Sequence, residues 1–388
     1  MSHTVDPSFI DELAHYGGSD IRACFNCGNC TAVCSLTDNE AVFPRKFIRY
    51  AQLGMKDRLV ASKEMWRCYY CADCSTTCPR QAEPGEFVAA ARRYMISQFD
   101  PTTLARRFYN SSAFTISFLV ALAAMLTLIM LAGYGSMPTG TLRLGSFIEV
   151  AYIHYTGQAV IIIAGTIALL SLVTMVKRLN EQLSNTERDS PADEAGGSAK
   201  SISWEAFKSA FYEVASQTRF DQCGTEAVPW YLRRRFIHLS IMWGFLGLLA
   251  ATVLDLLFKE PFSQVAVHYP MRLLGAIAGL FVLYGTSVAL VNRVRKLDRY
   301  FVHSLASDWL FLDMLWGVTL TGFIVEIAVY LPSGSVWAYV VFLIHVVAAM
   351  ILVLLLPFTK FAHAVLRPVA LFIHDFQTKR QIGGQSGG

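Results

Sequence analysis

The sequence predicts a mostly α-helical protein that consists of a small polar head and a bundle of six membrane-spanning helices. Apolar residues make up 54% of the 388 residues, and the mean hydropathy is +0.41, a value that soluble domains rarely reach. The first hundred residues are nevertheless polar, and they hold eight of the nine cysteines. The apolar excess therefore lies further along the chain, where six long apolar stretches follow.

The predicted head comprises residues 1–105. The segment PRKFIRYAQLGM (44–55) has the pattern of an amphipathic helix, and PGEFVAAARRYM (84–95) predicts a second one with a proline near its start. No apolar run opens the sequence, so we expect no cleaved signal peptide. The head should then remain in the reducing cytosol, where closely spaced cysteines bind metal rather than form disulfides.

Each apolar stretch has about 20 residues or more, enough to cross about 30 Å of hydrocarbon, which favours membrane spans over buried helices of a soluble domain. Between the second and third, the polar segment 180–201 lacks periodicity and predicts a flexible linker, followed by a short amphipathic segment at 203–220. The spans lie near 112–133, 151–176, 236–258, 271–291, 309–331 and 336–357. The predicted domains are the head (1–105), spans one and two (106–178), a cytoplasmic linker (179–232), spans three to six (233–368) and a cytoplasmic tail (369–388).

Lysine and arginine predict the orientation of the bundle, because they accumulate on the cytoplasmic side of a membrane. They gather before the first span, between spans two and three, between spans four and five, and after the sixth, while the opposite loops hold few. Both termini and the head are therefore expected in the cytoplasm, with the bundle in a bacterial or archaeal cytoplasmic membrane. The net charge of +4, without a basic and aromatic patch, does not indicate nucleic-acid binding.

Two cysteine runs with C-x2-C-x2-C-x3-C spacing predict a pair of [4Fe–4S] clusters. CFNCGNCTAVC begins at Cys24, and CYYCADCSTTCP begins at Cys68. Three cysteines at this spacing can surround one face of a cubane, whereas the fourth binds the other cluster in two-cluster ferredoxins. A pair of zinc sites, the alternative, gives no reason for the third and fourth cysteines. The predicted ligand sets are Cys24, Cys27, Cys30 and Cys78 for one cluster, and Cys68, Cys71, Cys74 and Cys34 for the other; Cys223 is interpreted as an ordinary thiol.

Histidines within or beside the apolar stretches predict haem b, because a polar side chain at bilayer depth is costly and usually functional. His345 and His363 lie 18 residues apart, which is five turns of one helix and roughly 27 Å, although Pro357 between them can kink it. His238 begins the third span on the cytoplasmic side, level with His363, and we pair these two. For His345 we favour His154 over His268 as the partner. The other four, His3, His15, His303 and His374, are interpreted as packing residues. The predicted fold is thus a helical two-cluster ferredoxin-type head joined to a six-helix transmembrane cytochrome b bundle.

These motifs resemble known families along nearly the whole chain. Both cysteine runs, with CGNC, resemble the C subunit of heterodisulfide reductase. RRFIHLSIMWGF (234–245) and LPFTKFAHAVLRP (356–368) resemble the cytochrome b subunits of that reductase and of nitrate reductase, the gamma subunit. The nitrate reductase pattern has histidines ten apart on one helix and eighteen apart on another; here Leu248 stands where the partner ten residues after His238 would be. The combination looks like the family of C subunits from quinone-interacting membrane-bound oxidoreductase complexes.

The resemblance implies a function in electron transfer. It implies that electrons pass between menaquinone and soluble partners through haem b and two clusters. We expect two haems, with His154 or His268 replacing the missing ligand, and the alternative is a single haem. The partners would be two flavin and iron–sulfur subunits related to heterodisulfide reductase A. Adenylylsulfate reductase in dissimilatory sulfur metabolism would be the further partner. Two alternatives are a membrane anchor of a heterodisulfide reductase and a non-redox transporter or receptor with a zinc-bound head. Charged residues near the outer ends of spans are candidates for the quinone site: Glu149, Lys259, Glu260 and Arg272.

Overall fold

The structure, a computed structural model, describes residues 5–37, 42–138, 142–189, 199–222, 228–258, 269–331 and 335–385. Within these ranges the regular secondary structure is helical, apart from one isolated bridge between Tyr134 and Ile148. The predicted mostly α fold is confirmed.

The head is a set of short helices around a compact core. Trp66, Phe47 and Phe87 are fully buried in this core. The two predicted amphipathic helices are confirmed as α3 and α6, although α6 continues four residues beyond its predicted end. The helices of the head are α1 (Phe9–Ala14), η1 (Ser19–Ala23), α2 (Asn29–Ala32), α3 (Arg45–Gln52), α4 (Lys56–Val60), η2 (Lys63–Arg67), α5 (Asp73–Thr76), α6 (Pro84–Phe99) and α7 (Leu104–Asn110).

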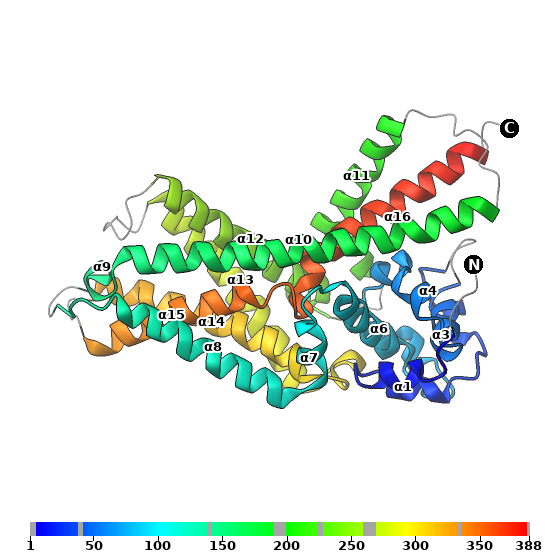
Figure 1. The fold of residues 1–388 in the computed structure, drawn as a ribbon, viewed down its shortest axis with the longest axis horizontal. Coiled ribbons are helices and arrows are strands. Elements are labelled where there is room, and N and C mark those ends of the chain that lie inside the picture. The colour runs from blue at the N-terminus through cyan, green and yellow to red at the C-terminus, as the bar shows by residue number, and fades with distance from the viewer. Residues whose placement is uncertain are drawn as a thin grey trace.

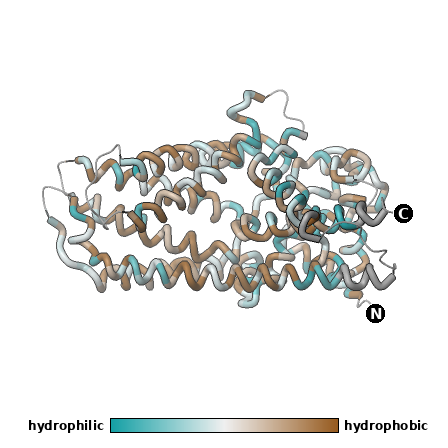
Figure 2. The backbone as a smooth tube through the Cα atoms, turned by 90° about the horizontal axis from the view of Figure 1, so that it is seen from above, coloured by the Kyte–Doolittle hydropathy of each residue, from teal (hydrophilic) through white to brown (hydrophobic). Residues whose placement is uncertain are grey.

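Six helices of the part described are long and apolar enough to span a membrane, which confirms the six predicted spans and indicates a multi-pass membrane protein. Hydrophobic residues run along these helices, while hydrophilic residues gather at the end that carries the head (Figure 2). The six are α8 (Ser112–Ala132), α10 (Val150–Asp189), α12 (Arg234–Phe258), α13 (Pro270–Val294), α14 (Ala306–Tyr330) and α15 (Val336–Leu354). Shorter elements in the connections are α9 (Leu144–Phe147), η4 (Trp230–Leu232) and η5 (Arg299–Phe301).

The segment between the second and third spans is more helical than predicted. Helix α10 continues to Asp189, well into the polar stretch that we expected to be a flexible linker. Helix α11 (Ala199–Ser216) then begins earlier than the predicted amphipathic segment, and η3 (Thr218–Gln222) follows it. The linker prediction was therefore wrong for 180–189, where a polar sequence continues the helix of the span. Residues 190–198 lie outside the described residues.

The prediction that His345 and His363 share one continuous helix is also wrong. Helix α15 ends at Leu354, and η6 (Lys360–Ala362) and α16 (His363–Gln385) form only after a turn. Pro357 lies in this turn and has no N–H with which to continue the helical hydrogen bonds. The Thr359 hydroxyl accepts a hydrogen bond from the N–H of Phe361, which starts the new helical segment.

The head lies against the end of the bundle together with α11 and α16 (Figure 1). Helix α16 joins the two parts, because the guanidinium of Arg367 donates to the carbonyl of Trp66 at 2.9 Å and Gln377 accepts a hydrogen bond from Lys63. The break before α16 therefore directs the C-terminal helix away from the bundle and onto the head.

Candidate metal centres

The two cysteine runs fold into the same loop twice. The N–H of Asn26 donates to the sulfur of Cys24 at 3.4 Å, and the N–H of Tyr70 donates to the sulfur of Cys68 at 3.2 Å. Left-handed backbone at equivalent positions turns these amides toward the sulfurs, and it costs energy at residues other than glycine. Strain of this kind is usual at a functional site. The positions are Asn26 (φ 60°) and Gly28 (φ 95°) in the first run, and Tyr70 (φ 55°) and Ala72 (φ 70°) in the second.

The structure places cysteines of the two runs beside one another. Burial raises the pKa of the Cys24 thiol, and the neighbouring Cys78 of the other run raises it further. Burial likewise raises the pKa of Cys34 to about 11, with a further contribution from Cys68 of the second run. Among the described residues, no three His, Cys, Asp or Glu side chains lie close enough to hold a single metal ion. We call Cys24, Cys27, Cys30 and Cys78 the first quartet, and Cys34, Cys68, Cys71 and Cys74 the second quartet.

These raised pKa values bear on how a metal centre would assemble. A ligating cysteine must be a thiolate, and burial opposes that charge unless a positive centre compensates it. The sulfurs of the two quartets and the amides turned toward them fit the donor set of a [4Fe–4S] cluster, which is held by four cysteine thiolates.

The inner histidine pair, His238 and His363, also comes together as predicted. Their ring centroids are 6.3 Å apart, although they lie on separate helices, α12 and α16. Two imidazoles on opposite sides of one metal, each with a metal–nitrogen bond of about 2 Å, have centroids roughly 6 Å apart. With this spacing, His238 and His363 would be able to hold one haem iron between them.

The protonation of the pair also fits a metal site. The Nδ1 of His363 bonds to the carbonyl of Lys360, which leaves Nε2 as the free lone pair. Burial lowers the pKa of His363 to about 4, so the imidazole is neutral at pH 7. The Nδ1 of His238 is buried and meets no hydrogen-bond partner among the residues that the structure describes.

His345 has a similarly fixed ring at a different level of the bundle. Its Nδ1 lies 3.1 Å from both the carbonyl of Val318 and the hydroxyl of Thr321 on α14. This contact again leaves Nε2 available as a ligand.

The structure does not bring His154 to His345. Met350 of α15 packs against Gly157 of α10, since a methyl group added at this glycine would lie 3.8 Å from the end of the methionine. Five residues of helix correspond to 500° of rotation, so His345 points roughly 140° away from the face that meets α10. The other candidate, His268, lies outside the described residues.

A glycine on α14 permits the close approach of the His345 ring. A Cβ at Gly322 would lie 3.0 Å from Cε1 of His345. We expect Gly322→Ala to cost about 1–3 kcal/mol of stability through overpacking and to displace the imidazole, as measured by thermal unfolding and visible spectra in detergent. Gly165→Ala is the matched control, because this glycine is exposed on α10 and a Cβ there meets no atom within 4 Å. Equal stability of the two variants would contradict the prediction.

The predicted quinone residues are only partly placed. Arg272 forms an ion pair with Glu326 at 2.8 Å and lies over the ring of Tyr330. The amide of Glu149 donates to the carbonyl of Gly133. Lys259, Glu260 and also Cys223 lie outside the described residues.

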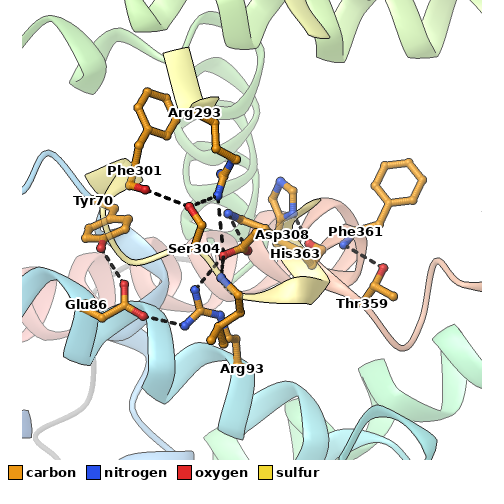
Figure 3. Close-up of polar contacts among 12 residues, drawn as sticks. Tyr70, Glu86, Arg93, Arg293, Phe301, Ser304, Asp308, Thr359, Phe361 and His363 are labelled. Atoms are coloured by element: carbon orange, nitrogen blue, oxygen red, sulfur yellow. Dashed lines mark hydrogen bonds and ion pairs between the residues drawn. The ribbon is translucent and has the colours of Figure 1, made fainter. Parts of the chain in front are cut away.

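A buried charge cluster joins the head to the bundle, and sequence reasoning missed it (Figure 3). Arg93 of α6 pairs with Glu86 at 2.7 Å and with Asp308 of α14 at 3.1 Å. Burial opposes the charge on Arg93, but the two carboxylates outweigh it and raise its pKa. Arg293 and Lys360 also approach Asp308, at 3.9 and 3.1 Å. We call Glu86, Arg93, Arg293, Asp308 and Lys360 the charge cluster.

An aromatic contact chain between the second quartet and the inner histidine pair was also missed. Tyr69 follows Cys68, and its ring lies 4.4 Å from that of Phe220 on η3. The ring of Phe220 lies 5.5 Å from that of His238. The sequence does show two tyrosines between Cys68 and Cys71, in the run CYYC. It does not show that Tyr69 contacts Phe220, because the two residues are more than a hundred positions apart.

Comparison with protein families assigns most of the chain. Residues 108–384 match the family described as citrate utilization protein B. The chain belongs to the citrate utilization protein B family. Residues 23–83 of this CitB-family chain also match a 4Fe–4S dicluster domain, which contains both cysteine runs.

Curated relatives match the iron–sulfur head. The chain is 32% identical over 88 residues to the C subunit of the H(2):CoB-CoM heterodisulfide,ferredoxin reductase of Methanothermobacter thermautotrophicus, covering 23% of this chain and 48% of the relative. It is 34% identical over 92 residues to the iron-sulfur C subunit of the CoB--CoM heterodisulfide reductase of Methanopyrus kandleri, covering 24% and 46%. The iron-sulfur C 2 subunit of the same kind of reductase from Methanocaldococcus jannaschii is 29% identical over 142 residues, covering 34% and 74%. The chain thus spans about half the length of the first two relatives.

These matches support a redox electron-transfer role and confirm the predicted likeness of the head to heterodisulfide reductase C. The family matched by the bundle is CitB, so the predicted membership of a quinone-interacting complex stays a prediction. No solved structure matches the chain.

Proposed function

We propose that this CitB-family chain passes electrons between membrane menaquinone and soluble partner proteins, using haem b on the inner histidine pair and a [4Fe–4S] cluster on each cysteine quartet. The observation that carries the proposal is the His238–His363 spacing of 6.3 Å at the junction of bundle and head. When bound, the haem and the clusters supply the one-electron chemistry. The protein's own residues hold these groups and fix their orientation.

The residues around each centre have separate tasks. The carbonyl of Lys360 orients His363, and that of Val318 orients His345, so that each Nε2 can reach a metal. The amides of Asn26 and Tyr70 stabilise thiolate charge in the two loops. A second haem at His345 is part of the proposal, with His268 rather than His154 as its second ligand.

The soluble partners are proposed from the relatives of the head. The names of those relatives describe subunits of heterodisulfide reductases, and we propose flavin and iron–sulfur subunits of that kind as partners, with adenylylsulfate reductase beyond them. The match of the bundle favours a second candidate, in which the partner is an oxidoreductase of citrate utilization. Both candidates use the same residues of this chain, and the soluble protein that reoxidises the reduced chain distinguishes them.

A reduced-minus-oxidised spectrum with pyridine haemochrome and iron analysis tests the proposal on the purified full chain. We expect b-type haem together with about eight cluster irons per chain, from two [4Fe–4S] clusters. Two haems per chain would support both sites, whereas one would support the inner histidine pair and reject a haem at His345. A colourless protein that contains zinc would overturn the proposal.

A further inference from the structure

We propose that the cluster on the second quartet is the membrane-proximal one, which exchanges electrons directly with the haem on the inner histidine pair, and that the cluster on the first quartet is distal. This inference rests on the proposed function and adds the order of the centres to it. Each transfer moves one electron from a reduced centre to an oxidised one, so no bond forms or breaks. The electrons come from the membrane quinol or, in the reverse direction, from a reduced soluble protein.

The first support is the aromatic contact chain. Tyr69 is the residue next to Cys68. The centroid of its ring lies 4.4 Å from that of Phe220, and the centroid of the Phe220 ring lies 5.5 Å from that of His238. The side chains between the second quartet and the histidine pair are therefore in continuous contact. Tyr69 is fixed at its other end, because its hydroxyl donates to Glu213 of α11.

The second support comes from two arginines that lie one helical turn from the two histidines. Arg234 precedes His238 by four residues, and Arg367 follows His363 by four, so each arginine shares a face of its helix with its histidine. Both reach the loop between Cys68 and Cys71.

The arginine contacts are direct. Arg234 donates to the carbonyls of Tyr69 and Tyr70 at 3.2 and 2.8 Å. The guanidinium of Arg367 lies over the ring of Tyr69, 3.9 Å from its centroid. Each helix that carries a histidine therefore also holds the second quartet's loop, which fixes the distance between the two centres.

The first quartet has different surroundings. Cys27 is exposed, and Cys24 opens into a cavity of about 760 Å³ whose lining, within the described part of the chain, lies between Ile10 and Gln52. Three cations of this lining, Arg45, Lys46 and Arg49, make the cavity basic. The second quartet instead surrounds a cavity of about 50 Å³. The distal position thus leaves the first quartet open to a soluble partner with acidic residues around its redox centre.

The bundle also touches the edge of the first quartet, but not through a helix that carries the histidine pair. Arg299 of η5 forms an ion pair with Glu83, five residues after Cys78. Arg299 therefore offers a matched control. It is a positive charge beside the loop of the first quartet, as Arg367 is a positive charge beside the loop of the second quartet.

The order is tested by reoxidation of the reduced full-length protein with a quinone analogue in detergent. Cys27→Ser leaves the second quartet intact. In this variant, the cluster on the second quartet is expected to keep the fast phase of reoxidation through the haem. Cys71→Ser leaves the first quartet intact. In this variant, the cluster on the first quartet is expected to lack the fast phase. Fast reoxidation in Cys71→Ser with slow reoxidation in Cys27→Ser, or equal rates in both, would overturn the order. A protein that contains no haem by pyridine haemochrome would overturn the proposed function and the order together.

A second measurement remains decisive if a cysteine variant fails to assemble. Removing a nearby positive charge disfavours the more negative, reduced state of a cluster. In redox titrations followed by electron paramagnetic resonance, Arg367→Gln should lower the reduction potential of the cluster on the second quartet and also that of the haem. Arg299→Gln should lower the reduction potential of the cluster on the first quartet and leave that of the haem unchanged. A haem shift in the Arg299→Gln protein, or none in the Arg367→Gln protein, would overturn the order.

Discussion

The His363→Gln protein is expected to contain one haem fewer than the wild type and to lose electron passage from quinol to the iron–sulfur head. Glutamine cannot replace the Nε2 lone pair, and the proposed haem would keep only His238 as a protein ligand. Residues that only hydrogen-bond to a metal ligand typically change the metal affinity by about 10–100-fold. Loss of the ligand itself should therefore weaken haem binding by more than about a hundredfold. Pyridine haemochrome and quinol-dependent reduction of the clusters measure the two effects.

His374→Gln is the matched control for this prediction. His374 lies on the same helix, is 7% exposed, and was interpreted from the sequence as a packing residue. The substitution should leave the haem content unchanged. A His363→Gln protein that retains its full haem content, with an unaltered spectrum, would show that the ring spacing of 6.3 Å does not reflect a metal site.

The parts of the fold that the sequence predicts well are those set by local spacing. The six spans follow from length and hydropathy, whereas the assignment of cysteines to each cluster stays a prediction from their spacing. The pairing of His238 with His363 was predictable because both lie at the same end of apolar stretches.

Other features depend on contacts between residues far apart in the chain. The turn at Pro357 ends α15 completely, whereas the sequence indicated only a kink, because the local pattern does not show where the next helix will pack. Arg93 and Asp308 are separated by 215 positions, so no periodicity connects them. The contact of His345 with Thr321 depends on such long-range packing as well, because it requires α14 to face that ring.

The charge cluster makes the junction of head and bundle sensitive to a single carboxylate. Asp308 is 3% exposed and lies within 4 Å of side-chain nitrogens from three cations. Asp308→Asn removes one of the two carboxylates that compensate the buried Arg93, and breaking a buried ion pair typically costs about 3–5 kcal/mol. We expect a lower thermal unfolding temperature and faster proteolysis within the head, because Arg93 belongs to α6 of the head and Asp308 belongs to the bundle.

Two further variants separate this effect from a general weakening of α14. Asp313→Asn changes an exposed carboxylate on the same helix and should leave stability within about 0.5 kcal/mol of the wild type. In the double variant Asp308→Asn with Arg93→Gln, removal of the stranded cation should restore part of the loss, as a double-mutant cycle detects. If Asp308→Asn is as stable as Asp313→Asn, or if the double variant loses the sum of the two single effects, the cluster does not hold the head to the bundle. Recovery in the double variant would instead show that charge compensation between Arg93 and Asp308 holds the head to the bundle.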